Sequence, residues 1–217
     1  MRRGSRLLIL AHRGNLRGPA RPARENAPET VRAALEAGFG VELDVRARHG
    51  RLYVSHDPRR ATAARAFERY EPLLRQADGQ GIGLDIKDAG AVTPLERRLR
   101  RLRLRGAFLF DFELVGMRPR AIRWHAIRVS DLPAEDYRCR RDLARRAYIW
   151  LDEMRGAWLT ASIVRDLRRR TRARLLWVSP ELHGRPHATR WRQALRWPID
   201  GICTDYPVAF RRWLDTR

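Results

Sequence analysis

The sequence predicts an α/β protein that folds as a (β/α)8 barrel, a TIM barrel, with a single domain over residues 1–217. Short apolar runs alternate with stretches of helical periodicity, and this alternation is typical of a parallel sheet covered by helices. When the two apolar runs on either side of Gly50 are counted as one unit, the chain has eight strand units. No linker, repeat or low-complexity segment divides the chain, and its length suits one domain with a sizeable core.

The expected strands are short apolar runs that mostly end in polar residues. The run 52–56 follows the run 41–45 after a turn containing Gly50, so we treat it as a short extension of the second strand. The runs lie at residues 7–12, 41–45, 52–56, 82–87, 107–113, 126–130, 147–153, 175–179 and 201–205.

Four stretches between these runs have the spacing of amphipathic helices. In residues 27–38, Pro28 lies in the first turn and Gly38 ends the pattern. The other three cover 93–106, 160–170 and 187–197, with apolar residues three or four positions apart. Arginines occupy the remaining positions of 97–105, which indicates a solvated outer face.

The chain is strongly basic, with 46 Lys and Arg residues against 25 Asp and Glu residues and a formal net charge of +21. Such a charge favours a nucleic acid or an anionic surface as partner. However, Lys87 is the only lysine, and the arginines are spread along the whole chain, which indicates a compositional bias rather than one binding face. A basic binding protein without catalysis therefore stays open as an alternative, and we expect no specific nucleic-acid partner.

Cysteine use and hydropathy predict a cytoplasmic protein. Cys139 and Cys203 are too few and too far apart to indicate a disulfide framework or a metal cluster. The apolar run from Leu7 to Ala11 is too short for the core of a signal peptide, and no apolar stretch approaches membrane-spanning length. We therefore expect no transmembrane segment, while the oligomeric state stays open.

Polar residues recur at the ends of the expected strands, where a barrel of this class carries its chemistry. Two pairs of carboxylates have the spacing that places both side chains on one face of a strand. The residues concerned are His12 and Arg13, Glu42 and Asp44, His56 and Asp57, Asp85 and Lys87, Asp111 and Glu113, and the later Asp152 and Asp205.

These residue types are suited to cleavage of a phosphodiester. Glu42, Asp44 and Asp85 could hold one hard divalent cation, Mg²⁺ or Ca²⁺, because such ions prefer carboxylate oxygens. The cation, Arg13 and Lys87 would neutralise a phosphodiester and the charge that develops on its oxygens. His12 and His56 have a suitable intrinsic pKa for exchanging protons at neutral pH, one with the attacking oxygen and the other with the leaving alcohol.

Two further residues are candidate substrate contacts with competing interpretations. Asn26 is one of only two asparagines, and it could instead cap the helix that begins near Pro28. Trp177 could contact substrate, although a tryptophan on a strand is more often a core residue. The remaining histidines are interpreted as structural or surface residues: His49, His125, His183 and His187.

The compound pattern resembles the glycerophosphodiester phosphodiesterases, which are relatives of the phosphatidylinositol-specific phospholipases C. The motifs are "AHRGN", "ENAPET", "VELDV", "GRLYVSHDP", "LDIK" and "DGICTDYP", and they cover residues 9–88 and 200–207. The resemblance implies a (β/α)8 barrel in which His12 and His56 are the acid and base, Arg13 contacts phosphate, and Glu42 and Asp44 bind metal. The chain is similar to a short, divergent member of this family.

The sequence departs from the family pattern at two places. Many members have a glutamate two residues before the lysine as third metal ligand, whereas this chain has Asp85 before Lys87. Many also carry a longer inserted segment after the second histidine, and here only residues 59–83 separate "GRLYVSHDP" from "LDIK". The first departure bears on the choice of metal, and the second leaves glycerol specificity open.

Together these features predict a metal-dependent phosphoric diester hydrolase that acts on a small-molecule phosphodiester. The expected reaction converts a glycerophosphodiester to glycerol 3-phosphate and an alcohol. The alternative enzyme is a cyclising, phospholipase D-like protein that acts on lysolipids or sphingomyelin and leaves a cyclic phosphate. The sequence does not decide between these reactions, and it leaves open whether residues 180–187 act as a lid.

Overall fold

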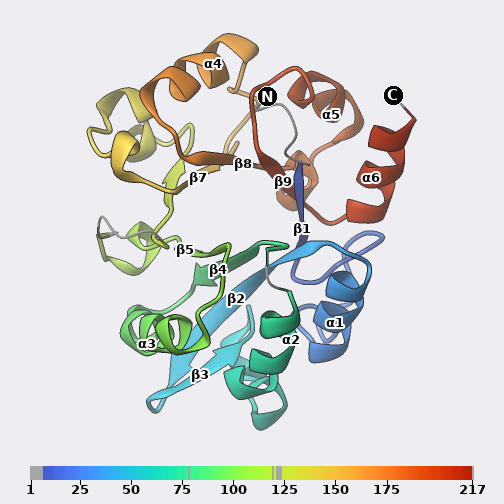
Figure 1. Ribbon diagram of the computed structural model, residues 1–217, viewed down its shortest axis with the longest axis vertical. Coiled ribbons are helices and arrows are strands. Elements are labelled where there is room, and N and C mark those ends of the chain that lie inside the picture. The colour runs from blue at the N-terminus through green and yellow to red at the C-terminus, as the bar shows by residue number, and fades with distance from the viewer. Residues whose placement is uncertain (1–6, 78, 119, 121–123, 217) are drawn as a thin grey trace.

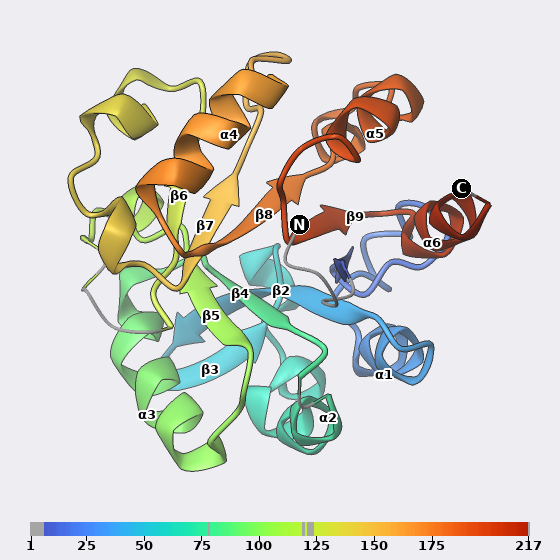
Figure 2. The same cartoon turned by 45° about the horizontal axis from the view of Figure 1, so that its top comes forward.

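The computed structural model describes residues 7–77, 79–118, 120 and 124–216. Parallel strands surround a central interior, and helices lie outside them (Figures 1 and 2). The barrel strands are β1 (Leu8–His12), β2 (Gly40–Arg48), β4 (Ile82–Ile86), β5 (Ala107–Phe110), β6 (Ile127–Val129), β7 (Tyr148–Leu151), β8 (Arg174–Val178) and β9 (Gly201–Thr204).

The strand order confirms the predicted (β/α)8 barrel. Neighbours follow the path β5-β4-β2-β1-β9-β8-β7-β6, and every pair along it is parallel. The first and last strands of the chain, β1 and β9, are therefore adjacent (Figure 1). At the ends of the path, Leu109 of β5 forms an isolated parallel bridge with His125, two residues before β6 begins. This bridge nearly closes the barrel.

A hairpin extends the second barrel strand, as the sequence predicts. Strand β3 (Arg51–Val54) pairs antiparallel with β2, and Val54 lies opposite Val45. The turn between them has positive φ at His49 (48°) and Gly50 (72°), a conformation that glycine adopts at little cost. Because β3 runs back along β2, the hairpin returns residues 55 and 56 to the carboxyl end of β2, where the Ser55 amide donates to the Asp44 carbonyl.

The helices surround the barrel in chain order (Figures 1 and 2). They are α1 (Pro28–Glu36), α2 (Glu71–Gln76), α3 (Val92–Leu102), α4 (Ala161–Arg170), α5 (Ala188–Ala194) and α6 (Pro207–Asp215). The four predicted helices are present but shorter than expected; α3 ends at Leu102 because Arg103 adopts a left-handed conformation. None of the helices in the described ranges combines the length and apolar character needed to cross a membrane.

The connections on either side of β6 depart from regular strand–helix alternation. Apart from β6, the regular elements among the described residues of 111–147 are 3₁₀ turns, with no α-helix. The expected strand over 107–113 is also too long: it ends at Phe110, because Asp111 has φ of 66° and Glu113 starts a 3₁₀ turn. Asp111 and Glu113 therefore do not share a strand face, and that prediction is wrong.

The buried apolar residues form two layers. The larger layer lies between the strands and the helices, whereas the smaller one fills the barrel interior. In the interior, Phe110 stacks on Trp150 with ring centroids 4.3 Å apart, and Phe108 stacks on Tyr148 at 4.5 Å. The interior beside β5 and β7 is thus filled with aromatic rings, and the polar interior positions belong to β1, β2, β4 and β6, where Arg128 lies buried.

Candidate active site

The polar cluster lies at the carboxyl ends of the barrel strands, which we call the mouth of the barrel. In β2, Glu42 and Asp44 alternate with Leu43 of the outer layer, so both carboxylates point into the barrel. Asp85 of β4 lies opposite Asp44 in the parallel register. The sequence prediction of a polar site at these strand ends therefore matches the placement of the side chains.

Glu42, Asp44 and Asp85 form a buried group of three carboxylates. Their ligand oxygens lie within 4.8 Å of one another. Asp85 Oδ1 is buried and has no hydrogen-bond partner among the described residues. Three hard oxygen donors and one unsatisfied carboxylate oxygen fit a divalent cation such as Mg²⁺ or Ca²⁺. Burial and the nearby Asp44 charge raise the pKa of Glu42 to about 8, so the group gains from a positive charge at its centre.

Two cationic side chains and one imidazole lie against Asp44. Its carboxylate lies 2.9 Å from Arg13 Nε, 3.1 Å from Lys87 Nζ and 3.2 Å from His56 Nδ1. Burial alone would raise the pKa of Asp44, but the contact with His56 and the charges of Lys87 and Arg13 hold it well below its usual range. Asp44 is therefore ionised at neutral pH even without a bound cation.

His12 has its proton position set by a partner that the sequence analysis did not assign. Its Nδ1 lies 2.7 Å from Asp205 Oδ1, so Nδ1–H donates to the carboxylate and Nε2 faces the carboxylate group, 3.8 Å from Glu42 Oε2. Burial lowers the pKa of His12, but the hydrogen bond to Asp205 and the Glu42 charge outweigh it, and the pKa is raised. Asn15 Nδ2 also donates to Asp205, at 2.7 Å. The "TDYP" motif at a strand end was the available signal for Asp205.

Arg13 lies in a left-handed turn that aims its side chain across the mouth. It has φ of 52°, and Gly14 follows with φ of 77°, so two consecutive residues turn the chain away from β1. A Cβ on Gly14 would lie 3.0 Å from the backbone nitrogen of Val31, which explains the glycine. The guanidinium donates to Glu25 at 2.9 Å and has Nη2 2.8 Å from His56 Nδ1. Arg13 thus connects Glu25 and His56, and it also contacts Asp44.

His56 lies on the opposite side of the carboxylate group from His12. Its side chain is 53% exposed, whereas that of His12 is 15% exposed. His56 contacts Asp44, and His12 approaches Glu42, so the two imidazoles flank the group. The hairpin of β2 and β3 is what brings His56 there.

Asn26 supports a carboxylate and does not contact the open mouth. Its Nδ2 donates to Asp44 Oδ2 at 2.7 Å, and its Oδ1 accepts from the Asp44 amide at 3.1 Å. The residue is 1% exposed, so its polar atoms are already used. The prediction of a substrate contact is therefore corrected to a positioning role. The capping interpretation is also wrong, because the α1 cap residue is Ala27.

Trp177 is a core residue. It is fully buried in the layer between strands and helices, with its ring edge-on to Trp197 at 5.4 Å. Neighbouring residues on β8 point to opposite faces, and at this position the side chain points out of the barrel. The prediction that Trp177 contacts substrate is therefore wrong.

Residues 180–187 are tied to the rim of the mouth. Glu181 accepts hydrogen bonds from Thr204 Oγ1 and from the Asp205 amide. His183 Nε2 lies 2.6 Å from Asp152 Oδ1 at the end of β7. These contacts join the segment to the strand ends on both sides of β8.

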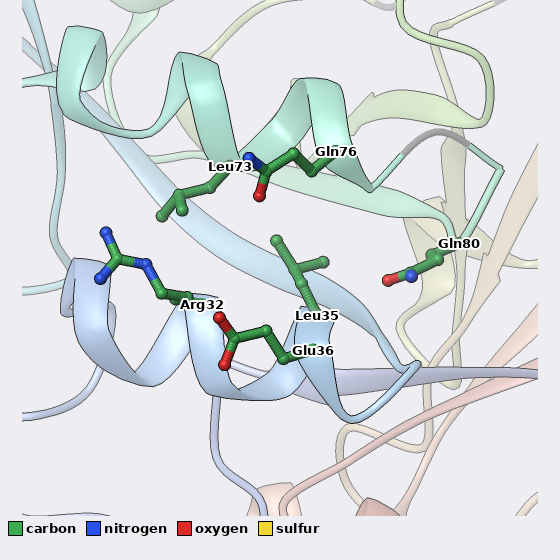
Figure 3. A pocket seen from close by; sticks show the side chains of 6 residues that line it. All are labelled: Arg32, Leu35, Glu36, Leu73, Gln76 and Gln80. Atoms are coloured by element: carbon green, nitrogen blue, oxygen red, sulfur yellow. The ribbon is translucent and has the colours of Figure 1, made fainter.

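A surface cavity of about 190 Å³ lies elsewhere on the molecule, between α1 and α2 (Figure 3). Leu35 and Leu73 face each other across it, with Gln80 at one end. Gln80 lies two residues before β4 begins and is therefore at the end of the barrel opposite the mouth. This cavity is separate from the polar site.

Comparisons with known proteins and structures show which proteins share this fold. No family model matches the chain, and no curated protein matches its sequence. The glycerophosphodiester phosphodiesterase from Thermotoga maritima superposes with a TM-score of 0.66 at 19% identity, covering 96% of this chain and 98% of that one. The one from Agrobacterium tumefaciens has a TM-score of 0.64 at 19% identity, covering 94% and 99%. The chain has the fold of the glycerophosphodiester phosphodiesterases.

The carboxylate group of this chain is complete with an aspartate, Asp85, as its third member. A third structure, from Parabacteroides distasonis, has a TM-score of 0.65 at 16% identity and covers 100% of this chain and 88% of that one. The shorter Asp85 still reaches the group, and Lys87 Nζ lies 2.5 Å from its Oδ2. The short segment after His56 folds as three 3₁₀ turns followed by α2.

Proposed function

We propose that the protein is a metal-dependent phosphoric diester hydrolase that converts a glycerophosphodiester to glycerol 3-phosphate and an alcohol. The observation that carries the proposal is the buried group of Glu42, Asp44 and Asp85 between two histidines at the mouth of the barrel. Carboxylates crowded at this site would repel a phosphodiester unless a cation lay between them. The fold shared with glycerophosphodiester phosphodiesterases supports the same reaction class.

Glu42, Asp44 and Asp85 would hold one divalent cation, Mg²⁺ or Ca²⁺. When bound, the cation supplies positive charge to the phosphate oxygens as negative charge develops on them. Arg13 and Lys87 contribute charge from the same side, and both are already held against Asp44.

His12 and His56 would move the protons of the reaction. The hydrogen bond to Asp205 leaves Nε2 of His12 as the atom that exchanges a proton at the mouth. One imidazole takes a proton from the attacking oxygen as the new phosphorus–oxygen bond forms. The other gives a proton to the leaving alkoxide as the old bond breaks, so the alcohol departs neutral. The attacking oxygen is either water or a hydroxyl of the substrate.

Product analysis separates the proposed hydrolysis from the cyclising alternative. Direct water attack gives an open phosphate monoester, whereas attack by a substrate hydroxyl gives a cyclic phosphate first. Phosphorus NMR of the reaction with a glycerophosphodiester is expected to show glycerol 3-phosphate as the final product. A cyclic phosphate that persists as end product would favour the phospholipase D-like reaction instead.

Removal of divalent cations is expected to abolish hydrolysis. Purified protein should release nitrophenol from bis(4-nitrophenyl) phosphate, lose this activity in EDTA, and regain it when Mg²⁺ or Ca²⁺ is restored, because the carboxylate group needs a counter-charge. Equal activity with and without EDTA would contradict the metal site. No cleavage of any phosphodiester under all these conditions would contradict the enzyme and would favour the basic binding protein.

Replacement of Asp205 by asparagine is expected to lower kcat by about 10- to 100-fold, because partners that orient a functional imidazole have effects of this size. The carboxylate also raises the pKa of His12, so the pH dependence of kcat/KM should move to lower pH in Asp205→Asn. A purely structural role for Asp205 would lower stability without moving the pH profile. Measurement of the full profile and the thermal midpoint therefore decides between the two roles.

A further inference from the structure

The loop that follows β1 is anchored to the candidate site near both of its ends. At one end, Asn15 Nδ2 and the Gly18 amide both bind Asp205, the partner of His12, at 2.7 Å and 2.8 Å. At the other end, Glu25 accepts a hydrogen bond from Arg13. Because both anchors contact candidate catalytic residues, the residues between them lie along the rim of the mouth.

The arginines of this stretch are not paired with acidic side chains of the described residues. Residues 14–24 include Arg17, Arg21 and Arg24 and no Asp or Glu. All three arginines are exposed, and none forms an ion pair with a carboxylate in the described part of the chain. The nearest acidic residue along the chain, Glu25, is already bound by Arg13.

A second loop adds to the same rim. Arg65 donates to the backbone carbonyls of Glu25 at 2.7 Å and Ala23 at 2.5 Å, so the segment that follows His56 is tied to the first loop. In this segment Arg60 is exposed and makes no ion pair with a described carboxylate. We call Arg17, Arg21, Arg24 and Arg60 the arginine rim.

Loops on the other side of the mouth have a different charge pattern. After β6, β7 and β8, arginines are interspersed with acidic residues, and many of them are paired. The pairs include Arg138 with Asp136, Arg140 with Glu113 and Arg190 with Glu153. The loop after β1 differs from these three loops, because its residues 14–24 include arginines and no acidic residue.

We propose that the arginine rim selects phosphodiesters whose leaving alcohol carries an additional phosphate. This inference rests on the proposed function, because it assigns the substrate class of the same site. The scissile phosphate would be met by Arg13, Lys87 and the cation, which leaves the rim free for a second anion. Guanidinium groups bind phosphate oxygens in a bidentate manner and keep their charge at all physiological pH values. A choline headgroup, which is cationic, would be repelled by the same surface.

The test compares two substrates that differ by one phosphate, glycerophosphoinositol and glycerophosphoinositol 4-phosphate. At about 0.05 M NaCl, kcat/KM is expected to be about tenfold higher for the phosphorylated substrate, since several exposed charge pairs together have effects of this size. The preference should largely disappear at about 0.5 M NaCl, because screening shortens the range of exposed charges. Equal kcat/KM values at low salt would overturn the inference while leaving the hydrolase intact.

Two triple variants with the same change in charge locate the effect. Arg17→Gln with Arg21→Gln and Arg24→Gln should reduce the tenfold preference to less than about twofold. The control combines Arg165→Gln, Arg172→Gln and Arg174→Gln, which are exposed and lie on α4 or at the amino end of β8, away from the mouth. It should keep the preference of the wild type. The same loss of preference in both variants would show an effect of net charge and would overturn the rim.

A binding measurement keeps the inference testable if no substrate is cleaved. Calorimetry with glycerophosphoinositol 4-phosphate should show about tenfold weaker binding to the rim variant than to the wild type and the control. If the wild type cleaves neither substrate but this difference in binding remains, the result contradicts the proposed function and supports binding of the additional phosphate by the arginine rim. Equal affinity for all three proteins would overturn the rim.

Discussion

Replacement of His12 by alanine is expected to lower kcat by about 10²–10⁴-fold, the range for loss of one acid–base group. Nε2 of His12 faces the carboxylate group while Nδ1 is held by Asp205, so no other described imidazole can take over its position. His56→Ala should have an effect in the same range, because its imidazole flanks the group from the other side. The measurement is turnover of a chromogenic phosphodiester at saturating Mg²⁺ or Ca²⁺.

A matched control tests whether the loss comes from proton transfer. His49 is exposed at the tip of the β2–β3 hairpin and has φ of 48°, a conformation that asparagine tolerates. His49→Asn should therefore retain activity close to that of the wild type. Turnover close to wild type in His12→Ala or His56→Ala, with thermal midpoints unchanged, would refute the role assigned to that histidine.

Replacement of Glu42 by glutamine is expected to have opposite effects on activity and on the stability of the metal-free protein. Loss of one carboxylate ligand should weaken cation binding and lower kcat/KM by at least about 100-fold. The same change removes a buried charge that lies beside Asp44. In EDTA, the free energy of unfolding of Glu42→Gln should therefore exceed that of the wild type at pH 8.

The sign of the pH dependence follows from the raised pKa of Glu42. The folded protein holds a proton that the unfolded chain has already released, so the stability of the metal-free wild type falls as pH rises from about 4.5 through about 8. The advantage of Glu42→Gln should grow by about 1–2 kcal/mol between pH 6.5 and pH 8. Denaturant unfolding in EDTA measures it, with the exposed Glu36→Gln as control. A constant difference across this pH range would contradict the electrostatic account.

The barrel could be predicted because its pattern is local. Eight apolar strand units with polar ends are visible in the sequence, and the register then places Glu42, Asp44 and Asp85 together. The 3₁₀ connections around β6 show no helical periodicity, which is why no helix was predicted there. The early end of β5 escaped prediction, since it depends on the left-handed conformation of Asp111, and apolar residues continue beyond it.

The partners of the site residues could not be predicted, because each joins distant parts of the chain. Asp205 reaches His12 only because β9 closes on β1, and the sequence shows no link between them. Asn26 was recognised as unusual, but its role depends on a left-handed conformation, with φ of 58°, that turns its amide onto Asp44. The residues next to Trp177 on β8 point into the barrel, whereas Trp177 points outward. A one-residue difference in register reverses the direction of a strand side chain, and the sequence alone did not define this register.

The aromatic filling of the β5–β7 side has a consequence for how this protein can change. The proposed reaction draws its residues from β1, β2, β4 and β9 and from the segments that follow these strands and β3, whereas Phe108, Phe110, Tyr148 and Trp150 fill the opposite side with packed aromatic rings. Loops attached to that side can be lengthened or replaced without moving a group that handles protons or cations. Selection for new headgroups, in nature or in the laboratory, should therefore accumulate insertions after β5, β6 and β7 and leave the loop after β1 and the β2–β3 hairpin nearly constant in length.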